Sequence, residues 1–259
     1  MTEVIHLRRE GDTATITMNR PPLNVLDIAT LDILGGYVEE VCLDSSVRFL
    51  IFGSEIDGVF SAGNDVADHT VERAPEMLKV FHRIFRSLLA SDVVTLAQVD
   101  GVCLGGGAEL ALFCDFVCSS DRSQFGFPEI KVGCFPPVAA AVLPLWVGTP
   151  RARRWILTGE TISLPALTEA GMIHRIVSTD DLAQAVEDTL NHLRNLSPDI
   201  LRLSRRAISG DENLQILERL QEAEDVYINQ ILRTPDAAEG VAAFMEKRSP
   251  KWKDDHSTL

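Results

Sequence analysis

VDGVCLGGGAELALFCDFVCSS, residues 99–120, is the stretch of sequence that decides the fold. An apolar strand pattern over Val93–Val99 ends at an Asp-Gly turn, and three glycines at 105–107 then lead into the apolar run that holds Glu109. Glycines at such a position let the backbone approach neighbouring groups closely. We therefore predict a strand, a tight glycine corner, a buried helix that begins inside the triplet, and a buried strand over Phe116–Ser119.

Strand and helix patterns also alternate in the residues before this stretch. The segments Val4–Arg9 and Thr13–Met18 alternate in polarity around a Gly-Asp turn, which predicts a hairpin. Helical periodicity over Ile28–Leu43 and Ala74–Ala90 flanks the apolar run Phe49–Phe52. The repeated β–α–β order indicates an α/β fold.

The last third of the chain is expected to be helical. From Val138 onward almost every segment has a helical period, and Pro198 and Gly210 lie near a predicted helix start and stop. No internal repeat or low-complexity linker occurs. The sharpest change falls between Ile176 and Ser178, so we predict a core of residues 1–177 and a helical region of residues 178–259.

Composition and charge exclude some classes of partner. The 259 residues are 46% apolar, and 38 acidic against 24 basic side chains give a formal charge of −14. Such a chain repels phosphate backbones, so nucleic acid is not an expected partner. Basic residues gather weakly in Arg151–Arg154, Arg202–Arg206 and Lys247–Lys253, which are either solvated helix faces or contacts to one polyphosphate ligand.

Cysteine use and the N-terminus bear on location. The five cysteines form no C-x-x-C pair, and no histidine stands at a metal-ligand spacing from them, so reduced thiols and no metal site are expected. The first residues lack the pattern of a signal peptide, and no run of about eighteen apolar residues occurs. We expect an unprocessed cytoplasmic protein with no membrane segment.

The glycine corner is suited to negative charge. Unpaired N–H groups at the start of a helix form a positively polarised site. A phosphate-binding loop is one possibility, but the Lys-Ser/Thr pair of that motif is absent and Ala108 and Glu109 stand there instead. A carboxylate opposes a phosphate dianion, whereas it suits a site in which a carbonyl oxygen becomes anionic.

Two glutamates stand in apolar surroundings. Glu109 lies among alanine, leucine and phenylalanine, and Glu129 lies in the segment FGFPEI at 125–130. An ionised carboxylate in such company is costly unless it is hydrogen-bonded or protonated. Glu109 either interacts with the helix dipole or serves chemistry; two such carboxylates can share one water molecule if their pKa values differ.

Other polar motifs give weaker signals. The segment FSAGND at 60–65 is either a tight strand-to-helix connection or a place where the backbone comes close to a ligand. His69 follows this segment and faces either a pocket or solvent, of which we expect solvent. No serine or cysteine stands in a nucleophile elbow, so hydrolysis by a catalytic triad is not expected.

Six motifs in order resemble those of the enoyl-CoA hydratase (crotonase) superfamily, nearly end to end. They are Asn19–Leu26, Phe60–Asp65, Asp100–Leu110, Phe125–Glu129, Leu157–Gly159 with Ala170–Ile173, and Phe244–Arg248. The resemblance implies a spiral of β-β-α units with a helical C-terminal domain. It also implies homotrimers that pair into hexamers and a CoA thioester substrate, with no separate cofactor.

The same resemblance implies the site residues by position. The backbone N–H groups of Asn64 and Gly106 would form the oxyanion hole. CoA and substrate contacts would fall on Pro22, Leu23, Ala62, Asp65, Val66, Gly105, Pro128, Phe135, Phe244 and Lys247. Hydratases of the superfamily carry glutamates at the positions of Glu109 and Glu129. By analogy, Glu129 would handle the proton on carbon and Glu109 the water.

Two departures from the ordinary hydratase pattern concern the acyl pocket. Residues 133–144 read GCFPPVAAAVLP where a glycine-rich segment is usual, and Ala67 replaces a common lysine. These features are similar to the cyclohexa-1,5-diene-1-carbonyl-CoA hydratases of anaerobic aromatic degradation. The alternatives are a hydratase of linear enoyl-CoA, an isomerase with one working glutamate, an RNA-binding member or a catalytically silent homologue.

Overall fold

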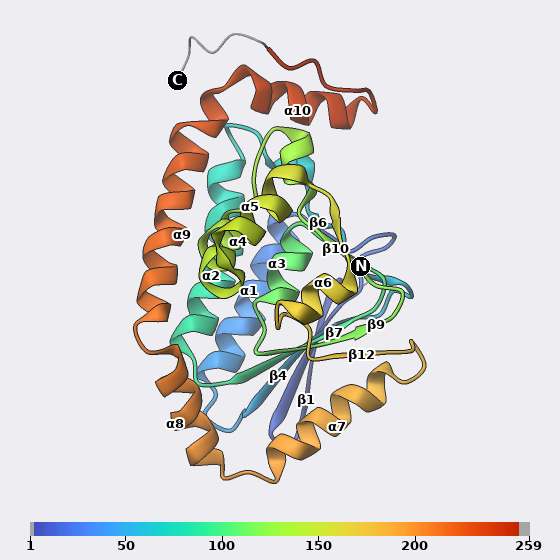
Figure 1. Cartoon of the computed structure of the whole chain (residues 1–259), viewed down its shortest axis with the longest axis vertical. Coiled ribbons are helices and arrows are strands. Elements are labelled where there is room, and N and C mark those ends of the chain that lie inside the picture. Colours follow the sequence, from blue (N-terminus) through green and yellow to red (C-terminus); the bar gives the residue numbers. More distant parts are fainter. Residues whose placement is uncertain (1–2, 254–259) are drawn as a thin grey trace.

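A six-stranded sheet begins with the predicted hairpin. The computed structural model describes residues 3–253, and the strands of this sheet are ordered β1-β2-β4-β7-β9-β12 (Figure 1). Their bounds are Ile5–Glu10, Thr13–Met18, Phe49–Ser54, Val94–Val99, Phe116–Ser120 and Arg175–Val177. Only β1 and β2 are antiparallel; the other neighbours run parallel.

A smaller sheet has four strands in the order β11-β10-β8-β5. The chain enters it after strands of the large sheet. Its strands are Thr161–Ile162, Gln124–Gly126, Val102–Leu104 and Val59–Ser61, and the short pair β3 (Val25–Leu26) and β6 (Gly63–Asn64) lies apart from both sheets. The chain passes three times from the large sheet to the small one and then into a helix: β4-β5-α2, β7-β8-α3 and β9-β10-α4. This is the predicted spiral of β-β-α units.

Ten α-helices among the described residues surround the sheets. Their bounds are α1 Ile28–Leu43, α2 Ala74–Ala90, α3 Gly106–Leu112, α4 Pro137–Leu143, α5 Thr149–Thr158, α6 Leu164–Glu169, α7 Leu182–Arg194, α8 Pro198–Ser209, α9 Glu212–Asn229 and α10 Pro235–Met245. Short 3₁₀ turns cover Val66–Asp68, Pro128–Val132 and Ile231–Arg233, and a π-helical turn covers Pro144–Gly148. The helices predicted over 28–43 and 74–90 are confirmed.

Two apolar clusters hold the helices on the large sheet. The larger contains the buried face of α2, where Phe81 and Phe85 meet edge to face with ring centroids 5.0 Å apart. The smaller lies between the opposite face of the sheet and α7, and includes Phe49, Leu96 and Leu190. Helix α7 therefore covers one face of the sheet, while α1, α2 and α3 pack on the other.

The C-terminal helices pack on the core. In Figure 1, α9 runs along the outer edge of the molecule, where it contacts α2 and α4. The large sheet ends at Val177, and the described chain beyond it is helical. The short strands β11 and β12 interrupt the helical pattern expected from Val138 onward. The division into two domains at residue 177 stays a prediction.

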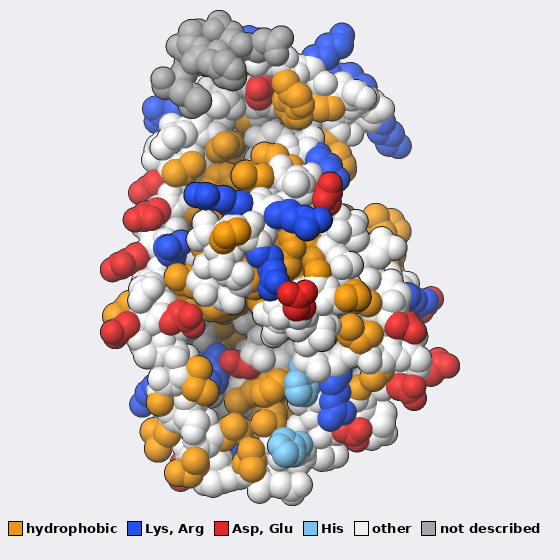
Figure 2. Space-filling model, in the orientation of Figure 1, with side chains coloured by type: hydrophobic (Ala, Val, Ile, Leu, Met, Phe, Trp, Pro, Cys, Tyr) orange, Lys and Arg blue, Asp and Glu red, His pale blue; other side chains and the backbone are white. Residues whose placement is uncertain are grey.

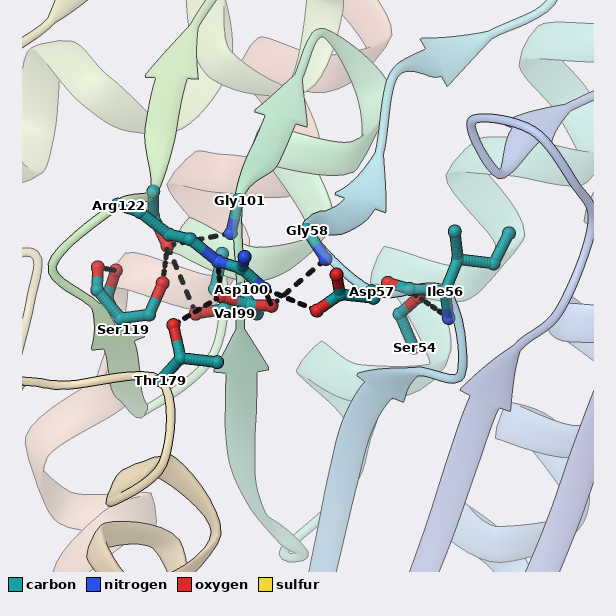
Figure 3. Close-up of polar contacts among 12 residues, drawn as sticks. Ser54, Ile56, Asp57, Gly58, Val99, Asp100, Gly101, Ser119, Arg122 and Thr179 are labelled. Atoms are coloured by element: carbon teal, nitrogen blue, oxygen red, sulfur yellow. Dashed lines mark hydrogen bonds and ion pairs between the residues drawn. The ribbon is translucent and has the colours of Figure 1, made fainter.

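One arginine ties together the three turns that join the sheets (Figure 3). Arg122 Nε donates to the Asp100 carboxylate at 2.8 Å, and Arg122 Nη2 donates to Asp57 at 2.6 Å. Asp100 also accepts from Gly58 N at 3.1 Å. The Arg122 guanidinium beside Asp100 lowers the pKa of that carboxyl to about 2. These bonds fix the turns from which β5, β8 and β10 start.

The surface is unevenly charged. Figure 2 shows acidic side chains along the edge formed by α9, whose Glu218, Glu222 and Asp225 are exposed, while basic side chains gather elsewhere on this face. None of the helices within residues 3–253 is both long and apolar enough to cross a bilayer.

Candidate active site

The small sheet places three site segments at one edge. Strands β5, β8 and β10 are parallel neighbours, so their carboxyl ends meet on the same side. Asn64 follows β5, Gly105 and Gly106 follow β8, and Glu129 follows β10. The three β-β-α turns of the spiral thereby bring together residues that are up to 65 positions apart (129 − 64).

Two backbone N–H groups are free to bind a ligand at this edge. Asp65 N donates to Leu26 O at 3.0 Å across the pairing of β3 with β6. Because backbone groups alternate in direction along a strand, Asn64 N–H points to the opposite side. Gly106 is the first residue of α3, and within residues 3–253 its N–H makes no hydrogen bond. The segments lie close, since a Cβ on Gly63 would stand 3.0 Å from Gly106 N.

The glycines at 105 and 106 are required by the groups that press on them. A Cβ on Gly105, which has φ +53°, would lie 2.7 Å from Glu129 Oε1. A Cβ on Gly106 would lie 2.5 Å from Asn64 Oδ1. The backbone corner, the Glu129 carboxyl group and the Asn64 amide therefore form one tightly packed arrangement.

A cavity of about 440 Å³ opens in front of this corner. Nine of the residues singled out from the sequence line it: Ala62, Asn64, Val66, Gly105, Glu109, Pro128, Glu129, Phe135 and Phe244. The cavity walls are mainly apolar, which is usual for a small-molecule site with a few placed polar groups.

Five of the sequence-derived site residues do not line the cavity: Pro22, Leu23, Asp65, Gly106 and Lys247. Leu23 O accepts from Ala62 N at 2.9 Å, and Lys247 N donates to Phe244 O at 3.1 Å, so both residues stand beside residues that do line it. The Asp65 carboxylate caps the following 3₁₀ turn by accepting from Ala67 N at 3.0 Å. Its side chain is thus already engaged.

Glu109 is held by the segment that departs from the ordinary hydratase pattern. Its side chain projects from the first turn of α3, only 4% exposed, and Oε1 accepts from Ala139 N at 2.8 Å. Ala139 belongs to the first turn of α4, where backbone N–H groups lack partners inside the helix. Burial raises the pKa of Glu109 to about 7, although the amides of Ala139 and Val138 lower it.

The pKa of Glu129 is affected by the charge of Glu109. It lies in the 3₁₀ turn after β10, and within residues 3–253 its enclosed Oε2 makes no hydrogen bond. Burial, and next the charge of Glu109, raise the pKa of Glu129 well above its ordinary value. Two such carboxyl groups titrate as a pair, because ionisation of one opposes ionisation of the other. The pair can supply one general base and one general acid.

The expectation that His69 faces solvent is wrong. The 3₁₀ turn at Val66–Asp68 directs the imidazole into the cavity wall, where Nδ1 lies 2.5 Å from the hydroxyl of Tyr227. Tyr227, on α9, is fully buried and was not identified from the sequence. Helical periodicity indicates only an apolar position there, because its partner lies 158 residues away.

Other chemistries find less support in the described residues. All five cysteines are unpaired thiols, and burial raises the pKa of Cys134, beside the cavity, to about 12. Within residues 3–253, no group of three His, Cys, Asp or Glu side chains is arranged to hold a metal ion.

The chain belongs to the enoyl-CoA hydratase/isomerase family, whose sequence model matches residues 8–255. It is 31% identical over 250 residues to the cyclohexa-1,5-dienecarbonyl-CoA hydratase of Thauera aromatica, with 96% of each chain covered. It is 30% identical to the crotonyl-CoA hydratase of Syntrophomonas wolfei, over 95% of this chain and 96% of that protein. An enoyl-CoA hydratase from Mycobacterium avium subsp. paratuberculosis superposes with a TM-score of 0.86 at 23% identity, over 97% of this chain and 99% of that one, which supports the crotonase-like fold.

Proposed function

We propose that this protein adds water to the conjugated double bond of an enoyl-CoA or dienoyl-CoA thioester. The observation that carries the proposal is the meeting of Glu109 and Glu129 in one cavity beside the backbone N–H groups of Asn64 and Gly106. Relatives named as hydratases support the same reaction. CoA is part of the substrate, and the proposed chemistry uses no other cofactor.

In the proposed mechanism, the thioester oxygen accepts hydrogen bonds from the N–H groups of Asn64 and Gly106. These donors polarise the conjugated system and stabilise the enolate that forms when water attacks. Glu109 takes a proton from the water as its oxygen bonds to carbon. Glu129 delivers a proton to the carbon of the enolate, so that H and OH are added across the unsaturated system and the thioester is kept.

The raised pKa values of the two carboxyl groups suit this division of labour. Addition of water needs one ionised and one protonated carboxyl group at the same time. Repulsion between Glu109 and Glu129 opposes ionisation of both in the buried site. A pair that carries one proton is therefore ready for the reaction in either direction.

Cyclohexa-1,5-diene-1-carbonyl-CoA, as in the degradation of benzoyl-CoA, is the substrate that we propose first. Its support is the 31% identity to the Thauera aromatica hydratase and the unusual segment that begins α4 and holds Glu109. Hydration of a linear enoyl-CoA is a second candidate, because the identity to the crotonyl-CoA hydratase is almost equal.

The CoA moiety is proposed to leave the cavity past α10. Phe244 and Lys131 line that part of the cavity, and they offer an apolar surface to adenine and a positive charge to phosphates. Arg248 lines it too, but its guanidinium is paired with Glu239 and Glu246. Lys247 N donates to Phe244 O, so Lys247 lies beside this part of the cavity. Pro22 and Leu23 would contact the pantetheine near Ala62, whose N–H donates to Leu23 O.

We propose a homotrimer, or a pair of trimers, in solution. No residue of α8 is buried within the single chain, and its Ile200 and Ile208 are 61% and 83% exposed. Figure 2 shows hydrophobic side chains at the surface in the region where α8 lies. Exposed apolar surface of this kind marks a contact with another protein surface.

The test is to offer the purified protein linear enoyl-CoA and cyclic dienoyl-CoA thioesters and to follow loss of conjugation by absorbance. Mass spectrometry should find products heavier by one water. A product of unchanged mass with a shifted double bond would replace hydration with isomerisation, and no reaction with any member would reject both.

A further inference from the structure

A polar pair interrupts the apolar wall of the cavity. His69 follows the second motif of the chain and Tyr227 belongs to α9, yet His69 Nδ1 and the Tyr227 hydroxyl are 2.5 Å apart. Tyr227 is fully buried, and the aromatic ring of Phe135 packs against it at 5.5 Å between centroids. The Tyr227 hydroxyl therefore holds the imidazole, and Phe135 packs against the Tyr227 ring.

The hydrogen bond to Tyr227 determines what His69 presents to the cavity. A phenol is the stronger donor and an imidazole nitrogen the stronger acceptor, so the assignment that fits is donation from Tyr227 to Nδ1. Nε2 then carries the proton. Within residues 3–253 Nε2 makes no hydrogen bond and is not among the fully enclosed polar atoms, and His69 lines the cavity, so this donor is available to a ligand bound there. Burial lowers the pKa of His69 to about 4, which keeps the donor uncharged at neutral pH.

The surroundings make this donor selective. Val66, Met77, Leu78 and Phe135 line the same cavity and offer the acyl group no hydrogen bonds from their side chains. A hydrocarbon acyl group would cover the Nε2–H group and leave it unpaired, which lowers affinity, whereas an acceptor oxygen would pair with it. The glutamate pair already supplies the acid and the base for hydration, so His69 has no proton to move in that step.

We propose that His69, positioned by Tyr227, determines substrate specificity by selecting acyl groups that carry an uncharged oxygen acceptor away from the thioester. A ring or chain carbonyl is the simplest such group. This inference rests on the proposed function in taking the ligand to be an acyl-CoA. It makes an oxygen-bearing cyclic thioester a better ligand than cyclohexa-1,5-diene-1-carbonyl-CoA, whose ring carries no acceptor.

Saturated thioesters test the selection without any hydration step. Isothermal titration calorimetry would compare shape-matched pairs: levulinyl-CoA against isocaproyl-CoA, 5-oxohexanoyl-CoA against 5-methylhexanoyl-CoA, and 4-oxocyclohexanecarbonyl-CoA against 4-methylcyclohexanecarbonyl-CoA. In at least one pair the oxo member should bind the native protein about tenfold more tightly, as expected for one paired donor. Tighter binding of the methyl member in every pair, or equal binding, would overturn the proposal.

Variants locate the source of the preference. His69→Leu should bring the ratio of the two affinities close to one, Tyr227→Phe should lower it several-fold, and His69→Gln, which keeps a donor, should retain part of it. His192→Leu makes the same change at an exposed histidine of α7 that does not line the cavity, and should leave the ratio unchanged. A preference that survives in His69→Leu would contradict the proposal. If the oxo thioesters bind as expected but conjugated thioesters are not hydrated, the proposed reaction fails and the selectivity of the cavity stands.

Discussion

At the scale of single residues, the buried pair Glu109 and Glu129 is costly to the fold. A carboxyl group whose pKa is raised on folding binds a proton more tightly in the native state than in the unfolded state. The free energy of unfolding therefore falls as pH rises from the ordinary value of 4.5 through the folded value of about 7. The site keeps two destabilising groups, as expected where function opposes stability.

Glu109→Gln should remove the part of this dependence that Glu109 causes, while Glu129 keeps its own part. At pH 5 the variant and the native protein should have similar free energies of unfolding, because Glu109 is then largely protonated in the folded state. At pH 8 the variant should be more stable by on the order of 1–3 kcal/mol. Urea unfolding at both pH values measures the difference. A variant that is no more stable than the native protein at pH 8 would show that Glu109 ionises without penalty.

The packing of Asn64 on Gly106 gives a second prediction at this scale. Gly106→Ala would place a methyl group 2.5 Å from Asn64 Oδ1 and displace the backbone donors. The rate of hydration should fall by about 10²–10³, as for loss of one oxyanion donor. Asn64→Ala with Gly106→Ala should regain part of the rate, because the clash is relieved. Equal rates in the single and double variants would contradict this explanation.

Sequence reasoning found Glu109 and Glu129 because carboxyl groups in apolar segments are unusual without a partner or a role. It did not find the hydrogen bond between His69 and Tyr227, since a contact between residues 158 positions apart leaves no local pattern. The ligand contact predicted for Asp65 stays a prediction, and the structure adds that its carboxylate caps a turn.

At the scale of elements, the turn anchored by Arg122 aligns the strands that carry the site. Asp100→Ala would leave Gly58 N–H without its acceptor and the Arg122 guanidinium with Asp57 alone. The free energy of unfolding should fall by about 1 kcal/mol, the usual net contribution of a hydrogen bond. Asp57→Ala is the matched control, because Asp57 binds the same arginine with its side chain 89% exposed and should have little effect. Thermal unfolding of both variants measures the difference. An equal loss of stability in the two variants would show that Asp100 does not anchor the turns.

The elements with strong periodicity were the easiest to predict. The predicted bounds of the helices Ile28–Leu43 and Ala74–Ala90 agree with the structure. In both segments, apolar residues recur at helical spacing over several turns. The strand Arg175–Val177 was missed since three residues are too few to establish a period. The spiral of β-β-α units followed from the family resemblance, whereas the pairing of β5, β8 and β10 was not predicted.

At the scale of the whole molecule, the exposed apolar face of α8 should bind another subunit. Ile208→Glu would place a charge on a side chain that is 83% exposed in the single chain. If α8 lies in a subunit contact, analytical ultracentrifugation should find a shift from trimer or hexamer toward monomer, because burial of an unpaired charge is unfavourable. Glu218→Gln on the acidic outer side of α9 is the control and should not change the assembly. A native protein that sediments as a monomer would reject the contact.

The central claim is that the carboxyl groups of Glu109 and Glu129 both act on the same bound thioester. The most direct measurement compares the hydration rates of Glu109→Gln and Glu129→Gln with that of the native protein, using the thioester it hydrates fastest, while calorimetry with a saturated analogue measures binding. Each variant should bind the analogue with near-native affinity and lose about 10²–10⁴ in rate. A variant that binds CoA thioesters and keeps a near-native rate would contradict the account.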